Sequence, residues 1–232
     1  MLELSLQEWN AIRLSLRIAA WATLCSLPPA TLIGYLLARG RFPGKTLLDG
    51  LCHLPLVLPP VVTGLVLLLL FGRTGPLGAF LAENFGIIFS FRWTGAALAC
   101  AVMSFPLMMR AIRLQIEAID RRLEAAAGTL GAGPVWTFFL VTLPLAIPGI
   151  VVGSILCFAK ALGEFGATIT FVSNIPGETQ TISALIYTYT QVPGGDAGAL
   201  RLTMVSFVIA FSALLASEVL QRRARARIAD IQ

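Results

Sequence analysis

Charged residues are scarce in this chain of 232 residues: they make up 12% of it, whereas soluble domains usually carry about 25%. Hydrophobic residues make up 57%, and the mean hydropathy is +0.84. This composition favours the interior of a lipid bilayer as the solvent around most of the chain. We therefore expect a membrane protein rather than a soluble domain.

Histidine is scarce and closely spaced cysteine pairs are absent, which argues against two kinds of metal site. His53 is the only histidine, so no histidine cluster is available for a metal ion. The cysteines lie far apart within apolar runs and form no CxxC pair, so small buried side chains are favoured over ligands or disulfides. No Ser-His-Asp, Cys-His or paired-carboxylate arrangement is visible, and we expect neither catalytic residues nor a cofactor. The cysteines are Cys25, Cys52, Cys100 and Cys157.

Long apolar runs, by contrast, are abundant, and five of them are long enough to cross a membrane. A spanning helix needs about 20 mostly apolar residues, and its backbone polar groups must pair within the segment. The runs are continuous rather than alternating, which excludes a β-barrel. We predict an all-α integral membrane protein with five transmembrane helices, at residues 18–38, 51–71, 93–109, 136–159 and 202–220.

Basic residues are distributed unevenly between the two sides of this arrangement. Eleven fall on one side and five on the other, with Lys160 near the end of the fourth helix. Because lysine and arginine accumulate in cytoplasmic loops, we expect the N-terminus outside and the C-terminus in the cytoplasm. Topology then explains the net charge of +5, and no nucleic acid is needed as a partner. The eleven are Arg39, Arg41, Lys45, Arg110, Arg113, Arg121, Arg122, Arg222, Arg223, Arg225 and Arg227, and the five are Arg13, Arg17, Arg73, Arg92 and Arg201.

Prolines and small residues interrupt the predicted spanning helices. Proline frees backbone carbonyl groups and kinks a helix, which is tolerated in a membrane where protein or a watery cavity satisfies the backbone. Gly149 and Gly153 form a GxxxG step that permits close helix packing. A transport pathway is favoured, with ordinary helix packing as the alternative. The prolines are Pro28, Pro29, Pro55, Pro59, Pro60, Pro106, Pro144 and Pro148.

The polar stretch 121–135 interrupts the apolar pattern on the predicted cytoplasmic side. Leu123 to Leu130 contains strong helix formers, and Gly131 and Gly133-Pro134 terminate the run. A helix this short is marginal alone, so contact with a partner or with its own bundle must hold it. We interpret it as a docking helix.

Gly44-Lys45-Thr46 resembles the end of a P-loop but lacks the earlier glycine and follows a membrane helix, so ATP is not expected to bind there.

The outer loop, residues 163–200, is long, rich in Gly, Thr and Ser, and preceded by a charged pair. Lys160 and Glu164 are four residues apart, so they share one helical face if the fourth helix continues. They are either an ion pair near the outer gate of a pathway or two solvated side chains at the membrane interface. The loop itself is expected to be partly re-entrant or to cap a pore, with a short amphipathic helix at 181–190.

The docking stretch resembles the cytoplasmic pattern E-A-A-x3-G-x9-I-x-L-P of importer-type ABC permeases. Gly131 takes the glycine position, Val141 the isoleucine position and Leu143-Pro144 the closing pair. Counting back puts the triplet at residues 125–127, so Glu124 lies one residue early, and we weight the small residues above the carboxylate. The resemblance implies a coupling helix in a groove of an ATPase subunit, with contacts from Glu124, Ala125, Ala126, Ala127, Gly128 and Gly131.

Three further strings resemble the molybdate permeases within that family: HLPLVLPPVV from His53, VMSFPLMMRAIR from Val102, and GEFGATITFVSNIPGETQTI from Gly163. The resemblance implies a type I ABC importer permease fold in the bacterial inner membrane. It implies a second permease copy, two ABC ATPase subunits that hydrolyse ATP, and a periplasmic oxyanion-binding protein. Residues 1–17 would then be a periplasmic segment, 18–220 the permease domain and 221–232 a basic cytoplasmic tail near anionic lipid.

The implied function is ATP-driven alternating access for molybdate, with tungstate or sulfate/thiosulfate as alternative oxyanions. Lys160, Glu164, Thr168, Thr170 and Ser173 are the expected pathway or gate residues, the hydroxyl groups making weak neutral contacts. An ion-coupled secondary transporter is a rival, but it would be expected to show a buried acidic relay or an inverted repeat. A membrane scaffold that moves nothing is a second rival, and the proline-broken helices argue against it.

Overall fold

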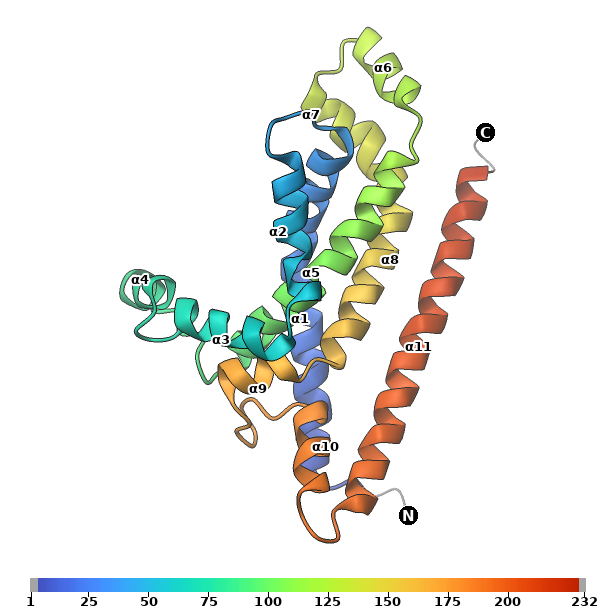
Figure 1. The fold of residues 1–232 in the computed structure, drawn as a ribbon. Helices are drawn as coiled ribbons and strands as arrows, with labels where there is room; N and C mark the ends of the chain where they lie inside the picture. The colour runs from blue at the N-terminus through green and yellow to red at the C-terminus, as the bar shows by residue number, and fades with distance from the viewer. Residues whose placement is uncertain (1–3, 230–232) are drawn as a thin grey trace.

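The computed structural model describes residues 4–229, without the side chains of residue 217 and residues 220–229. Throughout that range every regular element is a helix (Figure 1). Four helical segments are long and apolar enough to cross a membrane, and one bent pair makes a fifth if it counts as a single span. The predicted all-α membrane fold is confirmed. The helices are α1 (Leu6–Arg39), α2 (Lys45–Val57), α3 (Pro60–Phe71), α4 (Pro76–Phe85), α5 (Trp93–Glu117), α6 (Arg121–Thr129), α7 (Pro134–Thr137), η1 (Phe138–Thr142), α8 (Leu143–Leu162), α9 (Gly166–Val172), α10 (Ile182–Thr190) and α11 (Asp196–Ala229).

Helix α1 begins at Leu6, well before the predicted start at residue 18, so residues 6–17 of the predicted N-terminal segment are helical and continuous with it. A capping box starts it: the Ser5 hydroxyl accepts from the Glu8 amide, and the Glu8 carboxylate accepts from the Ser5 amide. Its 34 residues correspond to about 51 Å at 1.5 Å per residue. A bilayer core is only about 30 Å thick, so α1 extends beyond the hydrocarbon.

The second predicted helix, residues 51–71, is interrupted at its prolines, where a kink was expected, and the interruption is a complete break. It is two helices, α2 and α3, whose axes are bent by 113° at a short break. Pro59 and Pro60 cause the break because the residue before a proline is driven out of the helical region, and Leu58 has an extended ψ of 143°. Pro60 then opens α3 at its first turn, where a missing N–H costs nothing.

The fourth predicted helix is a continuous helical segment from Pro134 to Leu162 that contains one π-helical turn, η1. The Leu143 amide bonds to the Phe138 carbonyl, five residues back. Pro144 follows at once and has no N–H to donate to the usual carbonyl four residues earlier. The wider turn thus coincides with the Leu143-Pro144 pair that closes the sequence pattern.

The two connections that were predicted to lie outside contain helices of their own. Residues 72–92 include α4, which the sequence did not indicate. Residues 163–200 include α9 and α10, and α10 matches the short helix expected at 181–190, with the Thr181 hydroxyl capping its first turn. The long outer loop is therefore folded against the bundle rather than free.

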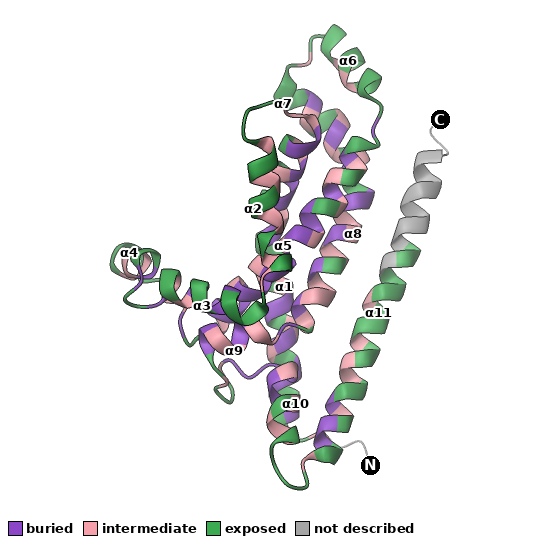
Figure 2. Ribbon diagram, in the orientation of Figure 1, coloured by how far each residue is buried: buried purple, intermediate pink, exposed green. Residues whose placement is uncertain are grey.

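The core is formed where α1, α5 and α8 cross, and small residues bring these helices close together. A side chain at Gly153 would place its Cβ 2.9 Å from the Met108 carbonyl oxygen on α5, so only glycine fits. Figure 2 shows exposed residues over α11 and α2, whereas the crossing region is largely buried. The predicted GxxxG step therefore lies at a helix–helix contact.

The two ends of the bundle differ (Figure 1). The start of α1, α9, α10 and the start of α11 lie at one end, called here the outer end. The connection from α1 to α2, helix α6 and the last described turn of α11 lie at the other, called here the inner end. Helix α11 begins at Asp196 and reaches Ala229, so residues 221–229 of the predicted tail continue it. The tail's arginine side chains and residues 230–232 lie outside the described residues.

Candidate functional site

The docking stretch folds as the short helix α6 at the inner end of the bundle (Figure 1). The Asp120 carboxylate caps it by accepting from the Arg122 amide at 2.9 Å. Gly131 ends it with φ of +87°, and the Ala132 amide returns to the Ala127 carbonyl at 3.0 Å. This is the glycine-dependent helix end that the sequence predicted.

The outward face of α6 is built from small, exposed residues. Ala125, Ala126 and Gly128 are exposed, and a Cβ placed on Gly128 would meet no atom within 4 Å. Leu130, at the end of the helix, is 88% exposed. These small residues give a partner close access to the backbone of α6, beside the exposed side chains of Arg121 and Arg122.

The inward face of α6 carries Glu124 and Ala127, both half-buried. The Glu124 carboxylate forms an ion pair with Arg39, the last residue of α1, at 3.0 Å from Nε. It also accepts a hydrogen bond from the Thr142 hydroxyl at 2.8 Å, at the end of the π-helical turn. Glu124 therefore joins α6 to the end of α1 and to the π-helical turn η1, which leads directly into α8. The sequence ranked this carboxylate below the small residues and did not single out Thr142 at all.

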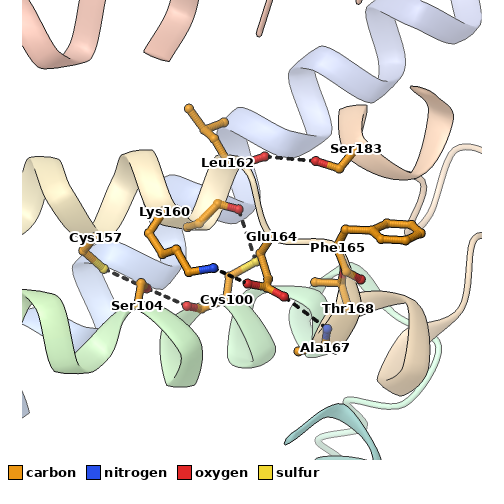
Figure 3. Close-up of polar contacts among 11 residues, drawn as sticks. Cys100, Ser104, Cys157, Lys160, Leu162, Glu164, Phe165, Ala167, Thr168 and Ser183 are labelled. Atoms are coloured by element: carbon orange, nitrogen blue, oxygen red, sulfur yellow. Dashed lines mark hydrogen bonds and ion pairs between the residues drawn. The ribbon is translucent and has the colours of Figure 1, made fainter. Parts of the chain in front are cut away.

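A second polar group lies where α8 meets α9, toward the outer end (Figure 3). Lys160 Nζ lies 2.9 Å from Glu164 Oε2, so of the two alternatives left open by the sequence, the structure has the ion pair. Glu164 is 2% exposed, and its other oxygen accepts from the Ala167 amide in the first turn of α9. The buried carboxylate is thus satisfied on both oxygens, while the Lys160 side chain remains about one third exposed, at 35%.

The three hydroxyl residues expected along the pathway lie on or beside α9. The Thr168 hydroxyl donates to the Phe165 carbonyl and the Thr170 hydroxyl to the Gly166 carbonyl, so both are used within α9. Ser173 is exposed just after the helix, with a φ of +64° that L-residues rarely adopt. The structure places these residues near one another and leaves Ser173 the most accessible.

Buried thiol and hydroxyl groups surround the ion pair (Figure 3). The Ser104 hydroxyl lies 3.1 Å from Cys157 Sγ, and Cys100 Sγ donates to the Ala161 carbonyl. At the start of α10, the Ser183 hydroxyl donates to the Leu162 carbonyl and ties that helix to the end of α8. These contacts join α5, α8 and α10 around Lys160 and Glu164.

The fold is that of solved ABC importer permeases. A chain of a bacterial alginate ABC transporter superposes with a TM-score of 0.73 at 19% identity, covering 94% of this chain and 80% of that one. At this identity the likeness shows the fold alone. It agrees with the type I importer permease fold implied by the sequence.

Closer relatives extend over nearly the whole chain. The molybdenum transport system permease protein ModB of Escherichia coli K12 is 58% identical over 220 residues, covering 95% of this chain and 96% of its own. ModB of Haemophilus influenzae is 51% identical over 221 residues, with the same coverage. The sulfate transport system permease protein CysT of Salmonella typhimurium is 39% identical over 184 residues, covering 78% of this chain and 66% of its own.

The profile of one family matches residues 30–226, which include the two polar sites described above. The family is described as "Binding-protein-dependent transport system inner membrane component". With a match over most of the chain and relatives well above 30% identity, the chain belongs to this family of multi-pass inner-membrane permeases.

Proposed function

We propose that this chain is the permease subunit of an ATP-driven molybdate importer. The observation that carries the proposal is the 58% identity to a molybdenum permease over 95% of the chain. The sulfate permease relative is more distant, at 39% identity over 78% of the chain. Molybdate is therefore the favoured cargo, with tungstate and sulfate or thiosulfate as alternatives that experiment can separate.

The inner end of the bundle is proposed to face the cytoplasm. Seven of the eleven basic residues that set the predicted topology lie at the end of α1, in the α1–α2 connection, at the start of α2, on the inner half of α5 or on α6. Helix α6 lies at this end, and its exposed residues Ala125, Ala126 and Gly128 would be accessible there to an ATPase subunit. The chain is then a non-catalytic membrane subunit, and ATP hydrolysis takes place on two separate ABC ATPase subunits.

A second copy of the chain is proposed to complete the pathway. Large hydrophobic side chains are exposed along α2, α3 and α11, including Leu65, Leu69 and Phe207. Lipid covers part of this surface, and a homodimer interface would cover the rest. The outer end, with α9 and α10, faces the periplasm in this arrangement and is the side from which a binding protein delivers the oxyanion.

Lys160 and Glu164 are proposed to belong to the outer gate. The pair links α8 to the first turn of α9, so a change in the angle between these helices has to move it. The carboxylate offsets the charge of Lys160, which keeps the positive charge weak toward a passing dianion and lets the anion leave. Thr168, Thr170 and Ser173 are retained as neighbouring residues of this gate.

An uptake assay tests the proposed cargo. The chain, produced with its ATPase subunit and binding protein in cells lacking their own molybdate permease, is expected to restore molybdate uptake. Excess tungstate should compete, whereas excess sulfate should not. Sulfate uptake that exceeds molybdate uptake would reassign the cargo, and no uptake of any of the three with an assembled complex would contradict the oxyanion assignment.

A further inference from the structure

The attachment of α6 to the bundle is concentrated at the Glu124 carboxylate. Arg39 Nε approaches both carboxylate oxygens, at 3.1 and 3.0 Å, and the Thr142 hydroxyl donates to one of them. Another nitrogen of the Arg39 guanidinium, Nη2, donates to the Ile119 carbonyl in the connection between α5 and α6. Both charged side chains are largely buried, at 11% and 18% exposure. We call these residues, Arg39, Glu124 and Thr142, the inner joint.

The inner joint lies at the ends of two long helices. Arg39 is the last residue of α1. Thr142 immediately precedes α8, whose 20 residues extend about 30 Å and end near Lys160 and Glu164. The ring of Tyr35 on α1 packs edge-on against Phe138 of the π-helical turn, with centroids 4.8 Å apart. A displacement of α6 therefore acts directly on α1 and on the start of α8.

The π-helical turn makes the start of α8 a suitable hinge. The turn has a wide hydrogen bond from the Leu143 amide to the Phe138 carbonyl, and Pro144 next to it donates none. The segments on either side are regular helix, so a change in direction is absorbed most easily at this point. Thr142, 0% exposed, ties the hinge to the carboxylate on α6.

We propose that the inner joint transmits the movement of α6 to the outer gate, through the ion pair to α1 and through Thr142 to α8. Arg39 and Thr142 are positioning residues, because they act through Glu124 and touch neither cargo nor nucleotide. The proposal rests on the proposed function in one respect: a partner must move α6. Loss of the joint should uncouple that movement from transport while leaving the outward docking face of α6 intact.

The test uses the complete importer in proteoliposomes, with radiolabelled molybdate and ATP. Glu124→Gln removes the ion pair but keeps the shape and an acceptor for Thr142, and Thr142→Val removes the hydroxyl while keeping the volume. Arg39→Gln removes the cation, and the double variant Arg39→Gln/Glu124→Gln tests whether the two act as one unit. Glu83→Gln, an exposed carboxylate on α4, is the matched control. Copurification with the ATPase, monodispersity and melting temperature are measured for each variant.

We expect every joint variant to keep its fold, and the Arg39→Gln and Thr142→Val variants, whose changes lie outside α6, to retain the ATPase. Transport should fall at least about fivefold per ATP hydrolysed relative to wild type. The double variant should be no worse than either single variant, because both remove the same link. The proposal would be overturned if a joint variant with the ATPase bound transported as many anions per ATP as wild type. It would also be overturned if the double variant lost transport by the product of the two single-variant losses. Failure of the proposed function looks different: neither wild type nor Glu83→Gln would then retain an ATPase or transport molybdate.

Discussion

Replacing a glycine of α6 or of its C-terminal end by alanine is expected to have opposite effects on the stability of the helix at Gly128 and at Gly131. Gly131 has φ of +87°, and a residue with a Cβ costs about 1–2 kcal/mol in that left-handed region. Gly128 lies inside α6, and its added Cβ would meet nothing within 4 Å. Alanine there should stabilise the helix by about 0.5–1 kcal/mol, because glycine loses more backbone freedom on folding. Both substitutions add the same methyl group, so the pair separates backbone conformation from bulk.

Hydrogen exchange of the α6 amides in the purified protein measures the effect. In Gly131→Ala the Ala132 amide, which bonds to the Ala127 carbonyl, should exchange roughly 5 to 30 times faster than in wild type. In Gly128→Ala the α6 amides should exchange roughly two to five times more slowly. Equal exchange in Gly131→Ala and wild type would show that the left-handed helix end is not what fixes α6. Faster exchange in Gly128→Ala would show that the space around it is not open.

Three further predictions concern the outer end and the core, each read from the melting temperature of the purified protein. Glu164→Gln should lower the melting temperature because Lys160 loses its counter-charge, and the double variant Glu164→Gln/Lys160→Met should recover most of that loss. A double variant as unstable as Glu164→Gln alone would contradict the pairing. Gly153→Leu should destabilise by about 1–3 kcal/mol or more, since its Cβ meets the α5 backbone at 2.9 Å, and a wild-type melting temperature would refute the close crossing. Arg201→Gln should cost about 1–3 kcal/mol because Glu8, 0% exposed, loses its cation at 2.9 Å; an unchanged melting temperature would exclude this contact.

The spanning helices could be predicted from the sequence because hydropathy records burial in lipid directly, but their ends could not. Helix α1 continues beyond the apolar run to Leu6 because Ser5 and Glu8 cap it, and a hydropathy profile does not distinguish polar residues in a helix from polar residues in a loop. The prolines near residue 59 indicated that the second predicted helix would be interrupted, but the bend of 113° depends on how α3 packs against α9. Local chemistry was therefore visible, and tertiary geometry was not.

The ion pair of Lys160 and Glu164 could be suggested from the sequence, whereas the contacts of Glu124 could not. Lys160 and Glu164 are four residues apart, so helical spacing alone was enough to suggest their ion pair. Glu124 and Arg39 are 85 positions apart, and nothing in a single sequence relates them. The shifted position of Glu124 in the family pattern made the carboxylate look secondary. Its contacts with Arg39 and Thr142 become visible only once α1, α6 and α8 are placed in space.

The most direct test of the account is whether an ATPase subunit binds the outward face of α6. Gly128→Trp adds a large side chain at a position of α6 where a Cβ would meet no atom within 4 Å, and Gly50→Trp makes the same change at an equally open helical position on α2. With the ATPase subunit coexpressed, the account predicts that wild type and Gly50→Trp copurify with it, whereas Gly128→Trp loses it and no longer supports molybdate uptake. A folded Gly128→Trp variant that retains the ATPase would contradict the central claim.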